Sequence, residues 1–235
     1  MKYIISLLMV TSSLLAQEYY AKIEPITTYS IKSAVSGKVT FSNKDLESTI
    51  VNNKVIIQID DKVNKIELKQ TKNKLKDLKN VLKIHRETLK SFNKVSSKSK
   101  FDKDKQRIII LNTKATINDL NIKIETLINN IHNKNIKVDN LYIDKIYVLK
   151  NDFVNPGTLL CRALDLNKGK LEIFVSRDEI LDIRSKDILI DGKRVDLKIN
   201  KIFKTADEKH LSSYKVEIII PKVNQFSKLV KVTFK

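Results

Sequence analysis

The sequence predicts an elongated α+β fold, in which a β sandwich is split by a long antiparallel α-helical coiled-coil hairpin and followed by a small β barrel. Three observations in the 235-residue chain support this prediction. Two segments with heptad-spaced apolar residues flank a short polar stretch, which is typical of a helical hairpin. Short strand-like segments lie on both sides of it. These flanking segments align with each other at a constant offset of 103 residues, which indicates two similar half-units.

The hairpin is expected over residues 62–133, with its tip near 94–100. Its apolar positions alternate steps of three and four residues, which produces a narrow seam on each helix. The expected seam residues are Leu68, Leu75, Leu78, Leu82, His85 and Leu89 in the first segment and Ile110, Ile117, Leu120, Ile124 and Leu127 in the second. When the chain folds back, seam positions pair so that their numbers sum to 195, which places the tip between Ser97 and Lys98.

Polar residues interrupt the seam at Thr71, His85 and Thr113. Such residues weaken a coiled coil but help to specify its register. Near the tip, Leu89 would face Gln106, so we expect the distal end to be looser than the rest. On this basis a His85→Leu substitution is expected to stabilise the hairpin.

The flanking segments are predicted to be one β domain in two halves, residues 33–61 and residues 134–166. Val35–Val39 aligns with Val138–Tyr142 without a gap, and Val51–Ile57 aligns with Val154–Leu160 in the same register. Neither half could bury an apolar face alone, so the two halves are expected to pack together around the inserted hairpin.

The remainder, residues 167–235, is predicted to be the β barrel, joined by one or more N-terminal strands from residues 17–32. We expect a short helix at Arg177–Ile183. Asp191-Gly192 is a strong hairpin-turn signal between two strands, the second of which is expected over Arg194–Asn200.

The first 16 residues predict a secretory signal peptide, because a basic start precedes a short apolar run and a small residue. An uncleaved membrane anchor is the alternative. The net charge of +18 comes mainly from Lys, in a chain that is also rich in Asn and Ile. We interpret most of these lysines as solvated surface residues, and predicted export argues against nucleic acid as the partner.

Residues suited to catalysis or metal binding are scattered. His132 and His210 are isolated, and no His, Cys, Asp or Glu cluster has metal-ligand spacing. Cys161 lies in an apolar run and is interpreted as a buried hydrophobe rather than a reactive thiol. The acid pairs Asp60-Asp61 and Asp207-Glu208 are expected to be solvated turn residues. We therefore predict no catalytic residues, no metal and no cofactor, and an enzyme is not expected.

The order of these segments resembles the HlyD-like membrane fusion proteins, the periplasmic adaptor subunits of efflux and secretion systems. Ser33–Val39 and Asn151–Leu160 are similar to the two halves of that family's lipoyl-like domain, and Leu171–Ser176 is similar to the first strand of its barrel. The resemblance implies a lipoyl-like sandwich without lipoylation. It also implies that a further membrane-proximal domain is truncated or absent.

The resemblance further implies a periplasmic protein of the Gram-negative envelope, peripheral to the inner membrane. It would link an inner-membrane pump, of the RND or the ABC type, to an outer-membrane channel protein, as a homo-oligomer and without nucleic acid. The family's tip motif is an Arg, a Leu four residues later and a Ser seven residues after that. Arg86 and Ser97 fit this spacing, Lys90 stands at the Leu position and Leu89 is its apolar neighbour, so these four residues are the candidate duct contacts.

Two other functions remain open. The chain could be an exported coiled-coil structural spacer of the cell envelope, although a spacer does not require a split β domain. A nucleic-acid-binding coiled coil is supported by charge alone. Residues 62–133 contain 18 Lys and Arg against 7 Asp and Glu, so hairpins packed side by side should repel each other. Assembly through the hairpin is therefore expected to use an acidic partner, or to strengthen with added salt.

Overall fold

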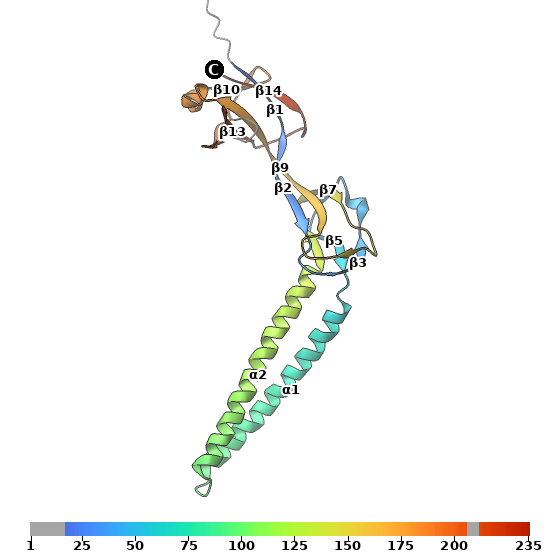
Figure 1. Cartoon of the computed structure of the whole chain (residues 1–235), viewed down its shortest axis with the longest axis vertical. Helices are drawn as coiled ribbons and strands as arrows, with labels where there is room; N and C mark the ends of the chain where they lie inside the picture. The colour runs from blue at the N-terminus through green and yellow to red at the C-terminus, as the bar shows by residue number, and fades with distance from the viewer. Residues whose placement is uncertain (1–16, 206–211) are drawn as a thin grey trace, which may run out of the picture. The chain divides into compact units, whose positions relative to one another are not determined.

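The computed structural model describes residues 17–205 and 212–235. The chain divides into two compact units, which we treat separately (Figure 1). Among the described residues, the first unit comprises 17–28 together with 164–205 and 212–235, and the second comprises Tyr29–Ala163. The first strand of the chain thus belongs with its C-terminal part.

Three features that were predicted from the sequence lie outside the described residues. They are the signal peptide at 1–16, the Asp207-Glu208 pair and His210. Within the part of the chain that the structure describes, no helix is long and apolar enough to cross a membrane.

The second unit contains short antiparallel strands around one aliphatic core. Its strands are β3 (Gly37–Ser42), β4 (Ile50–Val51), β5 (Lys54–Ile59), β6 (Asn135–Val138), β7 (Leu141–Ile146) and β8 (Phe153–Val154), with a 3-10 turn at Lys44–Leu46. Four of them form a sheet in the order β6-β5-β3-β8, and β4 pairs with β7. Completely buried core side chains come from both halves and include Val39, Ile56, Ile57, Ile59, Ile143, Ile146 and Leu160.

The internal repeat of the sequence corresponds to equivalent strands in this unit. β4 and β8 start 103 residues apart, and β3 and β7 start 104 residues apart. The halves exchange strands, because β3 of the first half pairs with β8 of the second, and β7 of the second pairs with β4 of the first. Neither half completes its pairing alone, so the chain must return to this unit after the hairpin.

The hairpin leaves this unit between β5 and β6. Helix α1 spans Lys62–Lys94 and helix α2 spans Lys100–Asn133, joined by the five residues Val95–Ser99 (Figure 1). β5 and β6 are antiparallel neighbours, with Gln58 opposite Asn135 at one end of their ladder. The last residue of β5 therefore lies beside the first residue of β6, and α1 begins next to the end of α2.

The first unit is also built from antiparallel strands. They are β1 (Glu18–Lys22), β10 (Ile188–Ile190), β11 (Lys193–Val195), β12 (Ile199–Ile202), β13 (Ser213–Ile220) and β14 (Leu229–Phe234). One sheet has the order β1-β14-β10-β11, and β12 pairs with β13, which pairs with the C-terminal half of β9 (Leu159–Ser176). β9 also pairs with β2 (Glu24–Lys32), and both strands contain a boundary between the units. Tyr19 packs edge-on against Phe234 in the core, with ring centroids 6.0 Å apart.

Two local predictions for this unit need correction. The short helix expected at Arg177–Ile183 is two 3-10 turns, Glu179–Leu181 and Ile183–Ser185. The strand expected over Arg194–Asn200 is interrupted, so that β11 ends and β12 begins within it. The Asp191-Gly192 turn between β10 and β11 forms as predicted, because both residues adopt positive φ angles of 50° and 79°.

Candidate functional site: the helical hairpin and its tip

The two helices pack along the seam positions that the heptad spacing predicts. On α2 the seam is buried at Ile110, Ile117, Leu120, Ile124 and Leu127. On α1 only Leu82 among the apolar seam residues is fully buried, while Leu68, Leu75, Leu78, His85 and Leu89 are half-buried. Leu82, Ile110 and Ile117 form the centre of one apolar cluster. Thr71 is buried as well, and its hydroxyl donates to the carbonyl of Glu67 one turn earlier, which satisfies the polar group within its own helix.

A polar layer lies in the distal seam, where Gln106 contacts His85 on the opposite helix. Gln106 is 7% exposed, and its Nε2 lies 3.1 Å from both the carbonyl oxygen and Nδ1 of His85. Because an amide nitrogen only donates, His85 Nδ1 is the acceptor in this arrangement. The buried amide is therefore satisfied by the opposite helix. This contact also removes the reason to expect that His85→Leu stabilises the hairpin, since leucine cannot accept a hydrogen bond.

We predict that the side chains of His85 and Gln106 are energetically coupled. A double-mutant cycle with His85→Ala and Gln106→Ala, measured by urea unfolding, should give a coupling energy of about 0.5–1.5 kcal/mol. Thr113→Ala with Gln106→Ala is the control, because the Thr113 hydroxyl donates within its own helix to Ile109. A coupling in the His85 cycle no larger than in this control would contradict the polar layer.

The candidate duct contacts lie in two places rather than in one cluster. Arg86 and Lys90 are exposed on α1, and Leu89 is half-buried against the seam cluster. Ser97 is exposed in the connection between the helices. At 1.5 Å per residue, Arg86 lies about 12 Å along the axis from the last residue of α1. A partner would have to extend over the last two turns of α1 to contact all four residues.

The tip presents two exposed apolar side chains that the sequence reasoning did not select. Val95 is 46% exposed and Phe101 is 75% exposed, on either side of the turn. Ser99 holds the start of α2 by accepting a hydrogen bond from the N–H of Asp102 at 3.0 Å. Phe101 could have been identified from the sequence, since it is an aromatic residue outside the heptad seam beside a polar turn.

The hairpin root is a second organised polar site, and it corrects the expectation for the acid pair Asp60-Asp61. Asp61 is 4% exposed rather than solvated. Its carboxylate accepts hydrogen bonds from Lys65 Nζ at 2.9 Å and from Asn135 Nδ2 at 3.3 Å. Burial alone would raise the pKa of Asp61, but these hydrogen bonds outweigh burial and hold the pKa below its ordinary value.

Lys134 completes the root from the α2 side. Its Nζ donates to the carbonyl oxygen of Asp60 at 2.7 Å and to Oδ1 of Asn64 at 2.6 Å. The carboxylate of Asp60 accepts the N–H of Lys62 at 3.1 Å, which satisfies one of the free donors at the start of α1. Side chains therefore join the first turn of α1 to the chain that leaves α2.

We predict that Asp61→Asn destabilises the protein by roughly 1–3 kcal/mol at pH 7, since a buried charge-assisted pair is lost. Because folding lowers the pKa of Asp61, its stabilising effect is present above the unfolded value of about 3.9 and is lost as the pH falls through the folded value. Urea unfolding at pH 7 and pH 3 should show the difference between wild type and variant shrinking at pH 3.

The matched control is Asp77→Asn, which removes the same charge from an exposed position on α1. This control should change the free energy of unfolding by less than about 0.5 kcal/mol. An equal effect of the two substitutions, or a loss at Asp61 that does not depend on pH, would contradict the root network.

The described residues offer little for catalysis. No group of three or more His, Cys, Asp or Glu among them could hold a metal ion. Cys161 is completely buried, and burial raises the pKa of its thiol to about 12, so the reactive thiolate is scarce at neutral pH. A cavity of about 720 Å³ lies in the first unit, but Asp187 and Arg194 on its wall pair with each other at 2.7 Å.

No family model matches the sequence, and no curated protein matches it either. Solved structures do match the fold. A MacA–MexA chimeric protein containing the Pseudomonas aeruginosa MexA α-hairpin domain is 16% identical with a TM-score of 0.69, over 93% of this chain and 81% of that one. The membrane fusion protein Spr0693 from Streptococcus pneumoniae R6 is 7% identical with a TM-score of 0.69, over 94% and 99%. MacA from Actinobacillus actinomycetemcomitans is 16% identical with a TM-score of 0.56, over 94% and 79%.

These likenesses cover nearly the whole described chain, including the split β unit, the hairpin and the following β unit. At such low identity they establish the fold and leave the activity to be argued from the residues. The resemblance that the sequence motifs indicated is confirmed at this level: the chain has the fold of the membrane fusion proteins.

Proposed function

We propose that this protein is a periplasmic adaptor that links an inner-membrane transporter to an outer-membrane exit duct in a tripartite efflux or secretion system. The observation that carries the proposal is the hairpin inserted between β5 and β6 of a β unit whose two halves exchange strands. The structures it resembles include a membrane fusion protein and two proteins built from MacA, all with a similar fold. The role is one of connection rather than catalysis.

The domains receive the following roles in this proposal. Residues 33–61 and 134–166 are the two halves of a lipoyl-like domain, residues 62–133 are a coiled-coil arm, and residues 167–235 with the strands of 17–32 are the barrel domain. Each helix of more than 30 residues would reach about 50 Å at 1.5 Å per residue. An arm of that length can connect two partners that are far apart.

The hairpin tip is the proposed duct contact. Ser97 in the turn and Arg86, Leu89 and Lys90 on α1 supply polar and charged groups together with one half-buried apolar side chain. We add Phe101 to this set, because a 75% exposed aromatic ring is the kind of side chain that dominates protein interfaces.

The contact with the pump is not assigned to particular residues, and the pump class, RND or ABC, stays open. In this proposal the protein is exported by its N-terminal segment, associates peripherally with the inner membrane and assembles as a homo-oligomer. The alternative, an exported structural spacer, would use the same hairpin as a rod but would require no contact at its tip.

Site-specific cross-linking tests the tip assignment. Ser97→Cys in a Cys161→Ser background, treated with a maleimide cross-linker in intact cells, should capture an outer-membrane channel protein identified by mass spectrometry. Ser97 is exposed, so the new thiol should react readily. The buried Cys161 would not compete in any case, because its thiol pKa is about 12.

The matched control is Asn80→Cys in the same background, an exposed position in the middle of α1. It should label equally well but should not capture the channel protein. If Ser97→Cys captures no outer-membrane protein while the folded variant is present at the wild-type level, or if both positions capture the same protein, the tip assignment is wrong.

A further inference from the structure

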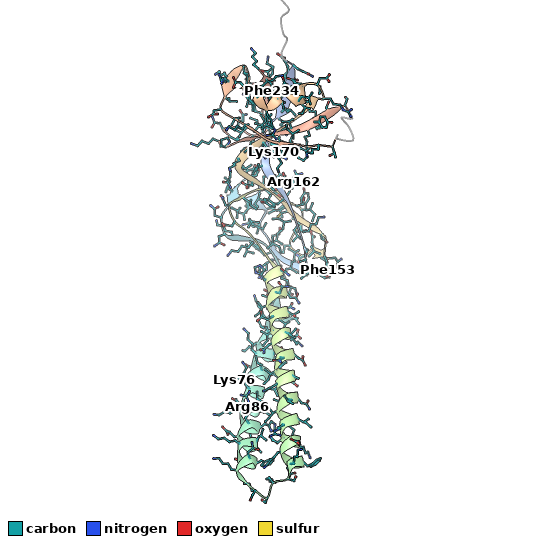
Figure 2. The ribbon with its side chains drawn as sticks, turned by 90° about the vertical axis from the view of Figure 1, so that its left-hand side faces the viewer. Lys76, Arg86, Phe153, Arg162, Lys170 and Phe234 are labelled. Carbon is teal, nitrogen blue, oxygen red and sulfur yellow. The ribbon has the colours of Figure 1, made fainter. Side chains whose placement is uncertain are left out.

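The positive charge of α1 is concentrated on one side of the helix. Nine cations occupy two adjacent heptad columns from residue 62 to residue 90, in alternating steps of three and four residues, and Asn93 takes the next position. These residues, which we call the basic stripe, are Lys62, Lys65, Lys69, Lys72, Lys76, Lys79, Lys83, Arg86 and Lys90. All nine are exposed. Lys76 and Arg86 lie on the same side of α1 in Figure 2. The stripe covers about 42 Å of helix at 1.5 Å per residue.

An ion pair identifies the face of the hairpin on which the basic stripe lies. Glu67 of α1 and Lys123 of α2 form an ion pair at 2.7 Å, and each of them directly precedes a seam residue. The positions that precede the seam on the two helices therefore lie on the same broad face of the hairpin. From Lys69 onward each stripe residue instead follows a seam position, which puts the stripe on the opposite face. Arg107 and Lys114 of α2 also follow seam positions and therefore lie beside the stripe, but so does Glu125, and Arg107 pairs with Asp104 at 2.8 Å. The α2 side of this face is therefore mixed in charge, and the excess of positive charge belongs to α1.

The basic stripe has few counter-charges among the described residues. Among the described residues only Lys65 of the stripe forms an ion pair, with Asp61. Like charges three and four residues apart repel each other along a helix, so the arrangement opposes helix formation unless something neutralises it. Because the basic stripe destabilises its own helix, we expect that it binds another molecule that carries negative charge.

A second copy of the hairpin does not supply a matching surface. Helix α2 contains four acidic residues, Asp102, Asp104, Asp119 and Glu125, which are not spaced as a ladder of threes and fours. Helix α1 contains three acidic residues against eleven basic ones. Two hairpins that met stripe to stripe would bring cations together, so we assign the occupant to a different chain.

We propose that the basic stripe docks an acidic α-helix of a partner protein, laid lengthwise along α1 with its carboxylates at three- and four-residue spacing. Successive cations on α1 are held at the spacing of one helical turn, which matches carboxylates presented in the same way by a second helix. The inference is independent of the tip contact proposed above, because it concerns the side of the arm.

The composition of the surface favours a helix with carboxylates over a lipid bilayer. A membrane-binding face would add apolar side chains, but the exposed apolar residues of α1, Val63, Ile66, Val81 and Ile84, lie outside the stripe.

Peptide binding to the full chain tests this proposal. The probe is a fluorescent 28-residue helical peptide with Glu at three- and four-residue spacing on one side, and the comparison peptide has the same composition with Glu spread around the helix. Fluorescence anisotropy should show binding of the first peptide at least about fivefold tighter than the second, and the affinity should fall with added salt.

Two triple variants of equal charge separate position from net charge. Lys72→Gln/Lys76→Gln/Lys79→Gln in the stripe should weaken binding of the acidic peptide roughly tenfold, since each exposed pair contributes modestly. The control Lys74→Gln/Lys94→Gln/Lys105→Gln removes three exposed cations outside the stripe and should weaken it by less than about threefold. Circular dichroism checks that both variants keep their helix content.

Three results would overturn the proposal. They are equal binding of the two peptides, equal loss of affinity in the two variants, and stripe-dependent binding of phosphatidylglycerol vesicles or polyphosphate that is tighter than binding of the acidic peptide. The last result would assign the stripe to a membrane surface or a phosphate polymer. Tighter binding of the one-sided peptide with selective loss in the stripe variant supports the acidic helix.

Discussion

The pairing of β5 with β6 is the constraint on which the rest of the hairpin depends. Because these strands are antiparallel neighbours, α1 begins where α2 ends, and the heptads of the two helices meet in one register. Asp61 and Lys134 add side-chain bonds across the same junction. A buried carboxylate here limits slippage, since a shift would leave its charge without partners.

The register of the two helices determines which side chains meet across the hairpin and which are exposed on it. It brings Gln106 against His85, and it sets the turn Val95–Ser99 at the far end with Phe101 exposed beside it. It also leaves the nine cations of the basic stripe exposed along one side of α1. Under the two proposals the arm makes two separate contacts, one at its tip and one along its side. A simple spacer would require neither contact.

Sequence patterns predicted the parts of the structure that depend on periodicity. The heptad spacing located both helices and the turn between them, and the offset repeat located strands that the two halves exchange. Patterns of this kind do not show which polar groups meet across a fold. The burial of Asp61 depends on Asn135, 74 residues away, and the Gln106 contact depends on the opposite helix. The 3-10 turns that replace the expected helix at Arg177–Ile183 were also missed, because short helical turns have no periodic signal.

Distances between spin labels on the two helices test the central claim, a hairpin held in one register, most directly. Cysteine pairs at exposed positions whose numbers sum to 195, Asn73 with Ile122 and Asn80 with Ala115, would be introduced into a Cys161→Ser background and labelled with nitroxides. Double electron–electron resonance should give one narrow distance for each pair, with the two distances within about 5 Å of each other, since paired layers repeat along the seam. Broad distributions, or distances that differ by more than one helical turn, about 5.4 Å, would contradict the single register.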